Sequence, residues 1–150
     1  AFDCNAEYGQ VNLCFNTEED FANTLERYQK GEFGHLYQTD KEIEGLKFNT
    51  GDWEYQCFAT IHVLTQDELA KIFNSLPEDN YKSWKEFTDR LLVHFCKTLL
   101  DFRQTELFHK IPKNKNFKSF CIDDDEDIDE AELRLKQLLS VSTQKEPLRK

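Results

Sequence analysis

Residues 83–102, SWKEFTDRLLVHFCKTLLDF, carry the most regular hydrophobic pattern in the chain and decide the fold prediction. Ser83 and Glu86 match a capping box, in which each side chain serves a backbone N–H group at the start of a helix. Apolar residues then recur at spacings of three and four, which is typical of one helix face. That face holds Trp84, Phe87, Leu91, Leu92, Phe95, Leu99 and Phe102, with Cys96 and Leu100 on its flank. The stretch predicts a long central helix.

Capping signals also predict helices on either side of this segment. Thr17 precedes three acidic residues, and a helix is expected over residues 17–30. Thr39 opens a short helix, and Thr65 with Glu68 forms a second capping box before a helix over 66–76. The last helix is expected over 127–140, with its leucines facing inward.

Residues 53–64 are interpreted as one more helix, either separate from 66–76 or joined to it as one bent helix. Trp53, Cys57, Ile61 and Leu64 recur at spacings of about four and suggest a buried stripe. Alternating strand patterns extend over no more than a few residues, and only 117–122 suggests a short extended piece. The expected fold is therefore all-α: a single-domain bundle of five or six amphipathic helices with about two disulfides, formed by residues 1–140. Residues 1–15 would be a disulfide-tethered arm and 141–150 a disordered tail.

Cysteine usage suggests an oxidising compartment. The five cysteines are dispersed, with no C-x-x-C motif and no zinc-like spacing. Together with a chain that starts at Ala1 and lacks methionine, this predicts a secreted protein whose signal peptide has been removed. The favoured pairs are Cys14–Cys57 and Cys96–Cys121, which leaves Cys4 as a free thiol or as the link of a covalent dimer.

Acidic residues dominate the charge. The formal net charge is −10, which argues against nucleic acid as a partner. Residues 123–132 hold eight acids in ten positions, but an EF-hand would need glycine at Ile128 and glutamate at Arg134. The run is either a solvated helix start or a patch for a protein partner, and no metal is predicted. The candidate patch consists of Asp123, Asp124, Asp125, Glu126, Asp127, Asp129 and Glu130.

Aromatic residues are abundant, with 13 Phe, 5 Tyr and 2 Trp. Large rigid rings either fill a core or line a cavity between helices that holds a small apolar ligand. The candidate lining of such a cavity is Trp53, Phe58, Trp84, Phe87 and Phe95.

Catalytic and cofactor signatures are not found in the sequence. There is no G-x-S-x-G, H-E-x-x-H or glycine-rich phosphate loop, and the four histidines are scattered. No stretch approaches the ~18 apolar residues of a transmembrane helix. We therefore expect a non-enzymatic, secreted protein that binds a macromolecular partner through a helix face, with the acidic run as a second contact. The alternatives are a carrier of a small hydrophobic ligand and, more weakly, a four-helix ligand of the cytokine type.

Overall fold

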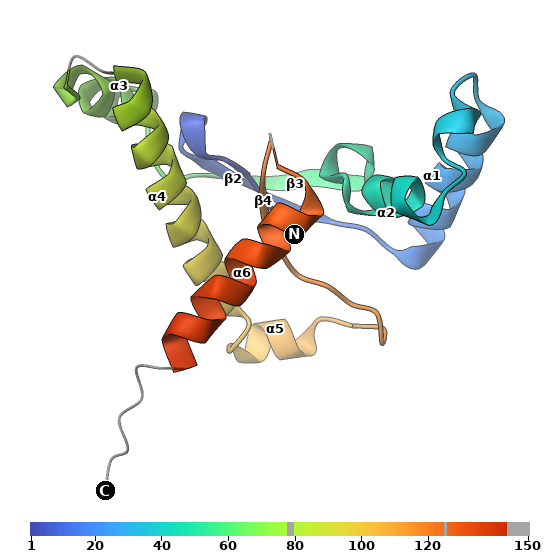
Figure 1. The fold of residues 1–150 in the computed structure, drawn as a ribbon. Coiled ribbons are helices and arrows are strands. Elements are labelled where there is room, and N and C mark those ends of the chain that lie inside the picture. The colour runs from blue at the N-terminus through green and yellow to red at the C-terminus, as the bar shows by residue number, and fades with distance from the viewer. Residues whose placement is uncertain (78–79, 125, 144–150) are drawn as a thin grey trace, which may run out of the picture.

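The computed structural model describes residues 1–77, 80–124 and 126–143, and its fold is mixed rather than all-α. About 60% of the described residues are helical and 15% are in strands, and the strands form one four-stranded mixed sheet (Figure 1). The all-α prediction is therefore wrong. The strands are β1 (Phe2–Asn5), β2 (Gln10–Phe15), β3 (Tyr55–His62) and β4 (Cys121–Asp123), in the spatial order β3-β2-β1-β4.

The N-terminal segment forms the middle of the sheet. β1 pairs antiparallel with β2 and parallel with β4, and β2 pairs antiparallel with β3. Residues 1–15 are therefore held by backbone hydrogen bonds and not by disulfides as predicted. At the turn into β2, Gly9 has a positive φ of 62°, and a Cβ there would lie 2.8 Å from the Leu64 Cβ. Its carbonyl accepts hydrogen bonds from the N–H groups of Val63 and Leu64, which ties this turn to the end of β3.

Side chains alternate between an apolar and a polar face of the sheet. Since directly paired residues share a face, the pairs Cys4–Val11 and Phe2–Leu13 lie on the apolar face. The pairs Asp3–Asn12 and Asn5–Gln10 lie on the polar face. A long helix covers the apolar face, whereas Ile122, which pairs with Asp3 on the opposite face, is buried in a separate cluster.

That helix is α4 (Asn80–Phe102), which begins three residues before the predicted start. Its Leu92, Phe95, Cys96 and Leu99 are buried with Cys4, Ala6, Val11 and Cys121 in the main core. The helix predicted from its hydrophobic stripe thus packs on a sheet and not on other helices.

The other predicted helices are present, with one exception. The structure contains α1 (Glu18–Lys30), α2 (Asp40–Phe48), α3 (Gln66–Ser75) and α6 (Ile128–Thr143), and a short α5 (Glu106–Lys110) that was not predicted. Thr39 and Thr65 form the capping boxes of α2 and α3. The exception is 53–64, which forms β3. Of the predicted tail, residues 141–143 belong to α6, and residues 144–150 lie outside the described residues.

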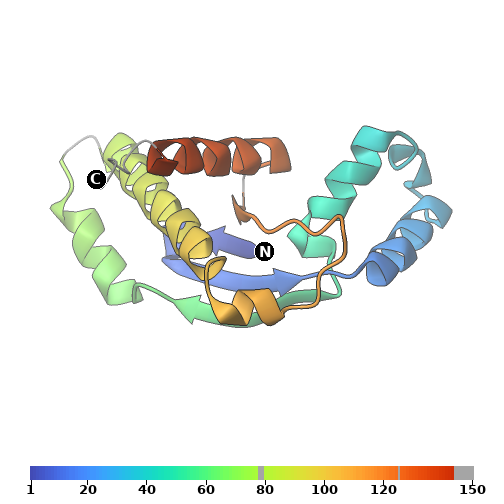
Figure 2. The ribbon, with the colours of Figure 1, turned by 90° about the horizontal axis from the view of Figure 1, so that it is seen from below.

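The helices are distributed unevenly around the sheet. α1 and α2 lie together beyond the end of β2, and α3 lies at the opposite end (Figure 1). α6 runs beside β4, at the edge of the sheet opposite β3 (Figure 2). Ala131 and Leu135 of α6 are buried with Cys14, Trp53 and Ile122 in a second core cluster. Within the described residues, no helix is both long and apolar enough to cross a membrane.

Phe95→Ala tests the packing of α4 on the sheet. Because the Phe95 side chain is only 3% exposed, we expect the variant to lose about 3–5 kcal/mol of unfolding free energy. Lys97→Ala, an exposed position on the same helix, should change it by less than about 0.5 kcal/mol. Urea denaturation followed by circular dichroism measures both, and equal effects would contradict the packing described.

Candidate functional site

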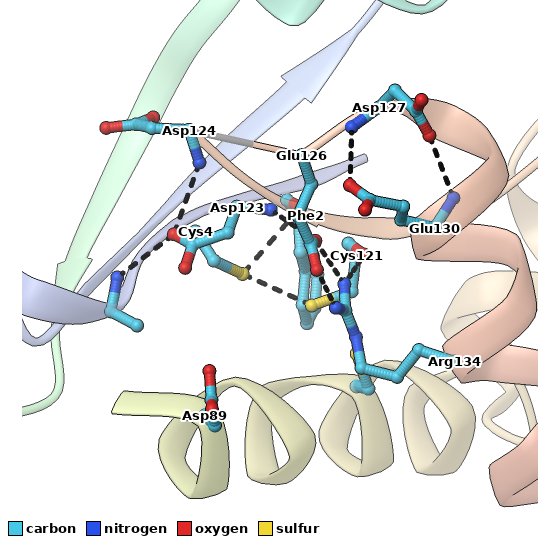
Figure 3. A network of polar contacts seen from close by, with 12 residues as sticks. Phe2, Cys4, Asp89, Cys121, Asp123, Asp124, Glu126, Asp127, Glu130 and Arg134 are labelled. Carbon is cyan, nitrogen blue, oxygen red and sulfur yellow. Dashed lines mark hydrogen bonds and ion pairs between the residues drawn. The ribbon is translucent and has the colours of Figure 1, made fainter. Parts of the chain in front are cut away.

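The acidic run begins where β4 ends, and its first members satisfy backbone groups. The Asp123 carboxylate accepts hydrogen bonds from the N–H of Ala6 at 3.4 Å and of Asp124 at 3.2 Å. The Asp124 carboxylate in turn accepts one from the Asn5 side chain at 2.7 Å. These contacts fasten the end of β4 to the end of β1 (Figure 3).

Glu126 and Arg134 form the ion pair at the centre of this network. Both guanidinium Nη atoms donate to the Glu126 carboxylate, and both side chains are largely buried. Arg134 also donates to the Cys121 carbonyl oxygen at 3.0 Å and to the Cys96 sulfur at 3.2 Å. Arg134 of α6 therefore contacts α4, β4 and Glu126 in the acidic turn, as we call residues 123–127 between β4 and α6 (Figure 3).

Asp127 and Glu130 start α6. The Asp127 carboxylate accepts from the Glu130 N–H at 3.0 Å, and the Glu130 carboxylate accepts from the Asp127 N–H at 3.3 Å. This is the reciprocal arrangement of a capping box. Asp129 is exposed in the first turn, and Asp125 lies outside the described residues. Much of the predicted patch therefore supports local structure.

Several of these acids also line a groove of about 470 Å³. Asp3 contributes from the polar face of the sheet, where its carboxylate accepts a hydrogen bond from the Thr50 hydroxyl at 2.7 Å. Burial raises the pKa of Asp123, and the negative charges of Glu126 and Asp124 act in the same direction. The use of this groove by a partner stays a prediction.

The cysteines are thiols, and the two predicted disulfides are wrong. The Cys4 and Cys121 sulfurs are 3.2 Å apart, well beyond the ~2.05 Å of a disulfide bond. Cys96 lies in the same cluster, and all three are fully buried. The Cys14 sulfur accepts a hydrogen bond from the Cys57 N–H at 3.2 Å. Cys57 alone among the five is exposed, so the accessible thiol is not Cys4.

The environments of the buried thiols oppose ionisation. A hydrogen bond to Cys121, followed by burial, raises the pKa of Cys96, and a hydrogen bond to Cys4 is the main cause that raises the pKa of Cys121. Burial raises the pKa of Cys14 to about 11. Thiols of this kind are poor nucleophiles, since the thiolate is the reactive form. Within the described residues no group of His, Cys, Asp and Glu side chains is arranged to hold a metal ion.

The aromatic residues predicted to line a ligand cavity do not meet. Phe95 belongs to the main core and Trp53 to the second cluster. Trp84 packs against Phe87 and Phe73 where α3 and α4 adjoin. Phe58 is 57% exposed on β3. These five positions therefore offer no common site, although the carrier function itself remains untested.

The feature that the sequence interpretation missed is β3. Seven of its eight residues are exposed, and it forms the edge of the sheet. Phe15 stacks on Tyr55 with ring centroids 4.1 Å apart and meets Phe58 edge-on at 5.3 Å. All three rings are exposed, as are the side chains of Ile61 and Val63. We call these five residues the β3 patch.

A bulge turns the Phe58 ring toward Phe15. The register shifts between the pairs Leu13–Ala59 and Phe15–Tyr55, and Cys57 has a positive φ of 49°. Bulges of this kind bend an edge strand and redirect its side chains. Regular pairing with β2 covers Ala59–His62, and this is the straight part of the edge.

The sequence matches the family described as a domain of unknown function, DUF4303, over residues 1–139, and the chain therefore belongs to that family. No curated protein and no solved structure matches the chain.

Asp123→Asn tests the electrostatic cost of the acidic turn. The folded-state pKa of Asp123 is raised above the unfolded value of about 3.9. Ionisation of Asp123 therefore lowers the free energy of unfolding as the pH rises from the pKa of the unfolded state through that of the folded state. The full decrease is reached at neutral pH. We expect the variant to be more stable than the wild type at pH 7, with the difference shrinking toward pH 4 in urea denaturation series.

Asp129→Asn is the matched control, because it removes a charge of the same sign from an exposed position. It should not stabilise the protein, since an acid in the first helical turn interacts favourably with the helix dipole. Equal stabilisation by both variants would show that overall charge, and not the burial of Asp123, sets the effect.

Thiol labelling tests the cysteine assignment. In denaturant without reductant, iodoacetamide should add five adducts, counted by intact-protein mass spectrometry. In native buffer, Cys57 should react at least about tenfold faster than the four buried thiols. Fewer than five adducts in denaturant would reveal a disulfide and overturn the assignment.

Proposed function

We propose that this member of the DUF4303 family is a non-catalytic protein-binding domain that takes up an extended segment of a partner alongside β3. The supporting observation is an eight-residue edge strand that is exposed along nearly its whole length. The sequence-based hypothesis of macromolecular binding is thereby kept, but the binding element is a strand edge and not a helix face.

Backbone groups of β3 are available to pair with another strand. The Val63 N–H donates to the Gly9 carbonyl, on the β2 side. Because alternate residues of an antiparallel strand direct their N–H and C=O groups to the same side, Ile61 and Ala59 also face β2. The backbone groups of Thr60 and His62 therefore face outward, and no strand within the described residues pairs with them.

The composition of β3 leaves this edge unprotected. Exposed edges are usually blunted by charged side chains or proline, and Tyr55–His62 contains neither. The bulge at Cys57 interrupts the edge only on one side of the straight part. The opposite edge of the sheet, by contrast, is closed where Arg134 of α6 donates to the Cys121 carbonyl of β4.

The β3 patch would supply apolar contact for the side chains of the added segment. Its rings are held in place by stacking, so that little side-chain entropy would be lost on binding. Exposed apolar patches on monomeric proteins commonly mark interaction sites. Strand addition with side-chain contacts of this kind is a known mode of peptide recognition.

Charge selects the type of partner. From Phe48 to Ala70 the chain contains four acids, Asp52, Glu54, Asp67 and Glu68, and no lysine or arginine. A segment with an apolar centre and basic ends would complement these charges. A second copy of the chain would bring the same acids together, at a net charge of −10 per copy. We therefore assign the edge to a basic segment of another protein.

An extracellular location stays a prediction. The hypothesis of secretion rested mainly on the expected disulfides, and the five free thiols do not support it. Strand addition requires no particular compartment.

Thr60→Lys and Thr60→Glu form a matched pair that tests the proposal. Both lose the 2.8 Å hydrogen bond between Thr60 and Asn12 and both place a long side chain on the edge, so they differ mainly in charge. The probe is a labelled peptide that alternates valine and threonine between flanking lysines. By fluorescence anisotropy, we expect Thr60→Lys to bind it about tenfold more weakly than Thr60→Glu, a difference of ~1.4 kcal/mol.

The same peptide with flanking glutamates is the control ligand, and it should bind the wild type more weakly. Hydrogen exchange of the Thr60 and His62 amides, followed by NMR, should slow on addition of the lysine peptide. Unchanged exchange at both amides would contradict strand addition. A dimer in sedimentation that Thr60→Lys abolishes would assign the edge to a second copy.

A further inference from the structure

A second surface, independent of β3, carries cations beside an apolar floor. A groove of about 300 Å³ lies between the end of α4, α5 with the segment that follows it, and α6. Phe108, Phe120 and Leu135 form its floor and are almost completely buried. Phe117 and Leu139 line it while remaining more than a third exposed, so a ligand seated there would cover apolar surface.

The charged side chains of the groove are mostly positive. Arg103, Lys118 and Lys136 line it together with one acid, Glu132. Glu132 is shared by both lysines, with N–O distances of 2.8 Å to Lys118 and 3.2 Å to Lys136. Lys118 also lies 3.9 Å from Glu44, which is outside the groove. The lining itself carries an excess of two positive charges in a chain whose net charge is −10.

Arg103 is the cation that remains available. It sits just after α4 and is half-buried, yet it has no hydrogen-bonded or ion-paired side-chain partner in the part of the chain that the structure describes. Partial burial makes an unpaired charge costly, and an anion in the groove would offset that cost. The planar guanidinium suits a carboxylate in particular, because two parallel N–H groups match its two oxygens.

The size of the groove limits the rest of the ligand. Its volume lies at the lower end of the range of small-molecule sites, roughly 300–1,000 Å³. A single aromatic ring system or a short acyl chain fits this volume, whereas a long-chain lipid does not. Phe117 and Leu139 would contact such an apolar body while Arg103 held its acid group.

We propose that this groove binds a small organic carboxylate with an aromatic or short aliphatic body. Arg103 pairs with the carboxylate, Lys136 adds a second positive charge, and the side chains of Phe117 and Leu139 contact the apolar part. This site shares no residue with the β3 patch, so its success or failure is separate from that of the proposed protein-binding function.

Binding of 2-naphthoate tests the proposal, with 2-naphthamide as the neutral analogue of the same shape. Saturation-transfer NMR and calorimetric titration should show naphthoate binding at least about tenfold more tightly than the amide. Arg103→Gln should weaken naphthoate binding about tenfold and leave the affinity for the amide nearly unchanged. Arg90→Gln, at an exposed arginine on α4, is the matched control and should change naphthoate binding less than twofold.

Equal binding of naphthoate and naphthamide, or equal losses in Arg103→Gln and Arg90→Gln, would overturn the proposal. Shifts of the Phe117 and Leu139 NMR signals on titration would support the location. A variant truncated after Thr143 tests whether residues 144–150 compete with the ligand for the groove. Binding of naphthoate to the truncated variant alone would show such competition, and the proposal would then be wrong for the full chain.

Discussion

The close packing of α4 on the sheet is the contact on which the rest of the structure depends. Cys4, Cys96 and Cys121 come from β1, α4 and β4, and all three are fully buried where these elements meet. Small side chains at this point let the helix approach the strands closely, and close packing is what core stability requires. The same contact brings β1 beside β4, which follows it by more than a hundred residues. The sulfurs therefore act as small core groups, and hydrogen bonding within the cluster, together with burial, raises the pKa values of Cys96 and Cys121.

The position of α4 also explains why the two edges of the sheet differ. α4 buries residues of β1, β2 and β4, and its core cluster includes none from β3. β4 is additionally flanked by α6, whose Arg134 reaches a β4 carbonyl and pairs with Glu126 (Figure 3). β3 has neither kind of cover. Its aromatic side chains, Tyr55 and Phe58, pack on Phe15 instead, and this leaves an apolar strand edge in contact with solvent.

Local signals in the sequence predicted most of the helices but, of the sheet, only a short extended piece at 117–122 that overlaps β4. Thr39 was identified as a helix start from its capping signal and Thr65 from its capping box, because helix caps are formed by residues within one turn. β1 and β2 are short, and Phe2–Asn5 and Gln10–Leu13 alternate over only four residues each, the shortest run that indicates a strand. β3 was predicted as a helix because Trp53, Cys57 and Ile61 recur at four-residue spacing. In a strand the same spacing also places residues on one face, and the bulge at Cys57 further disturbs the alternation.

The sites were predictable only where their chemistry is local. The acids of residues 123–130 were recognised by composition, but their roles depend on Ala6, Asn5 and Arg134, which the sequence does not place beside them. The β3 patch requires Phe15 to meet Tyr55 and Phe58 across a sheet whose existence was not predicted. The groove between α4, α5 and α6 likewise combines Arg103 with Phe117 and Lys136, which come from three different segments. A functional surface built by tertiary contacts in this way gives no periodic signal, so the sequence marks the residue types involved while the fold determines which of them act together.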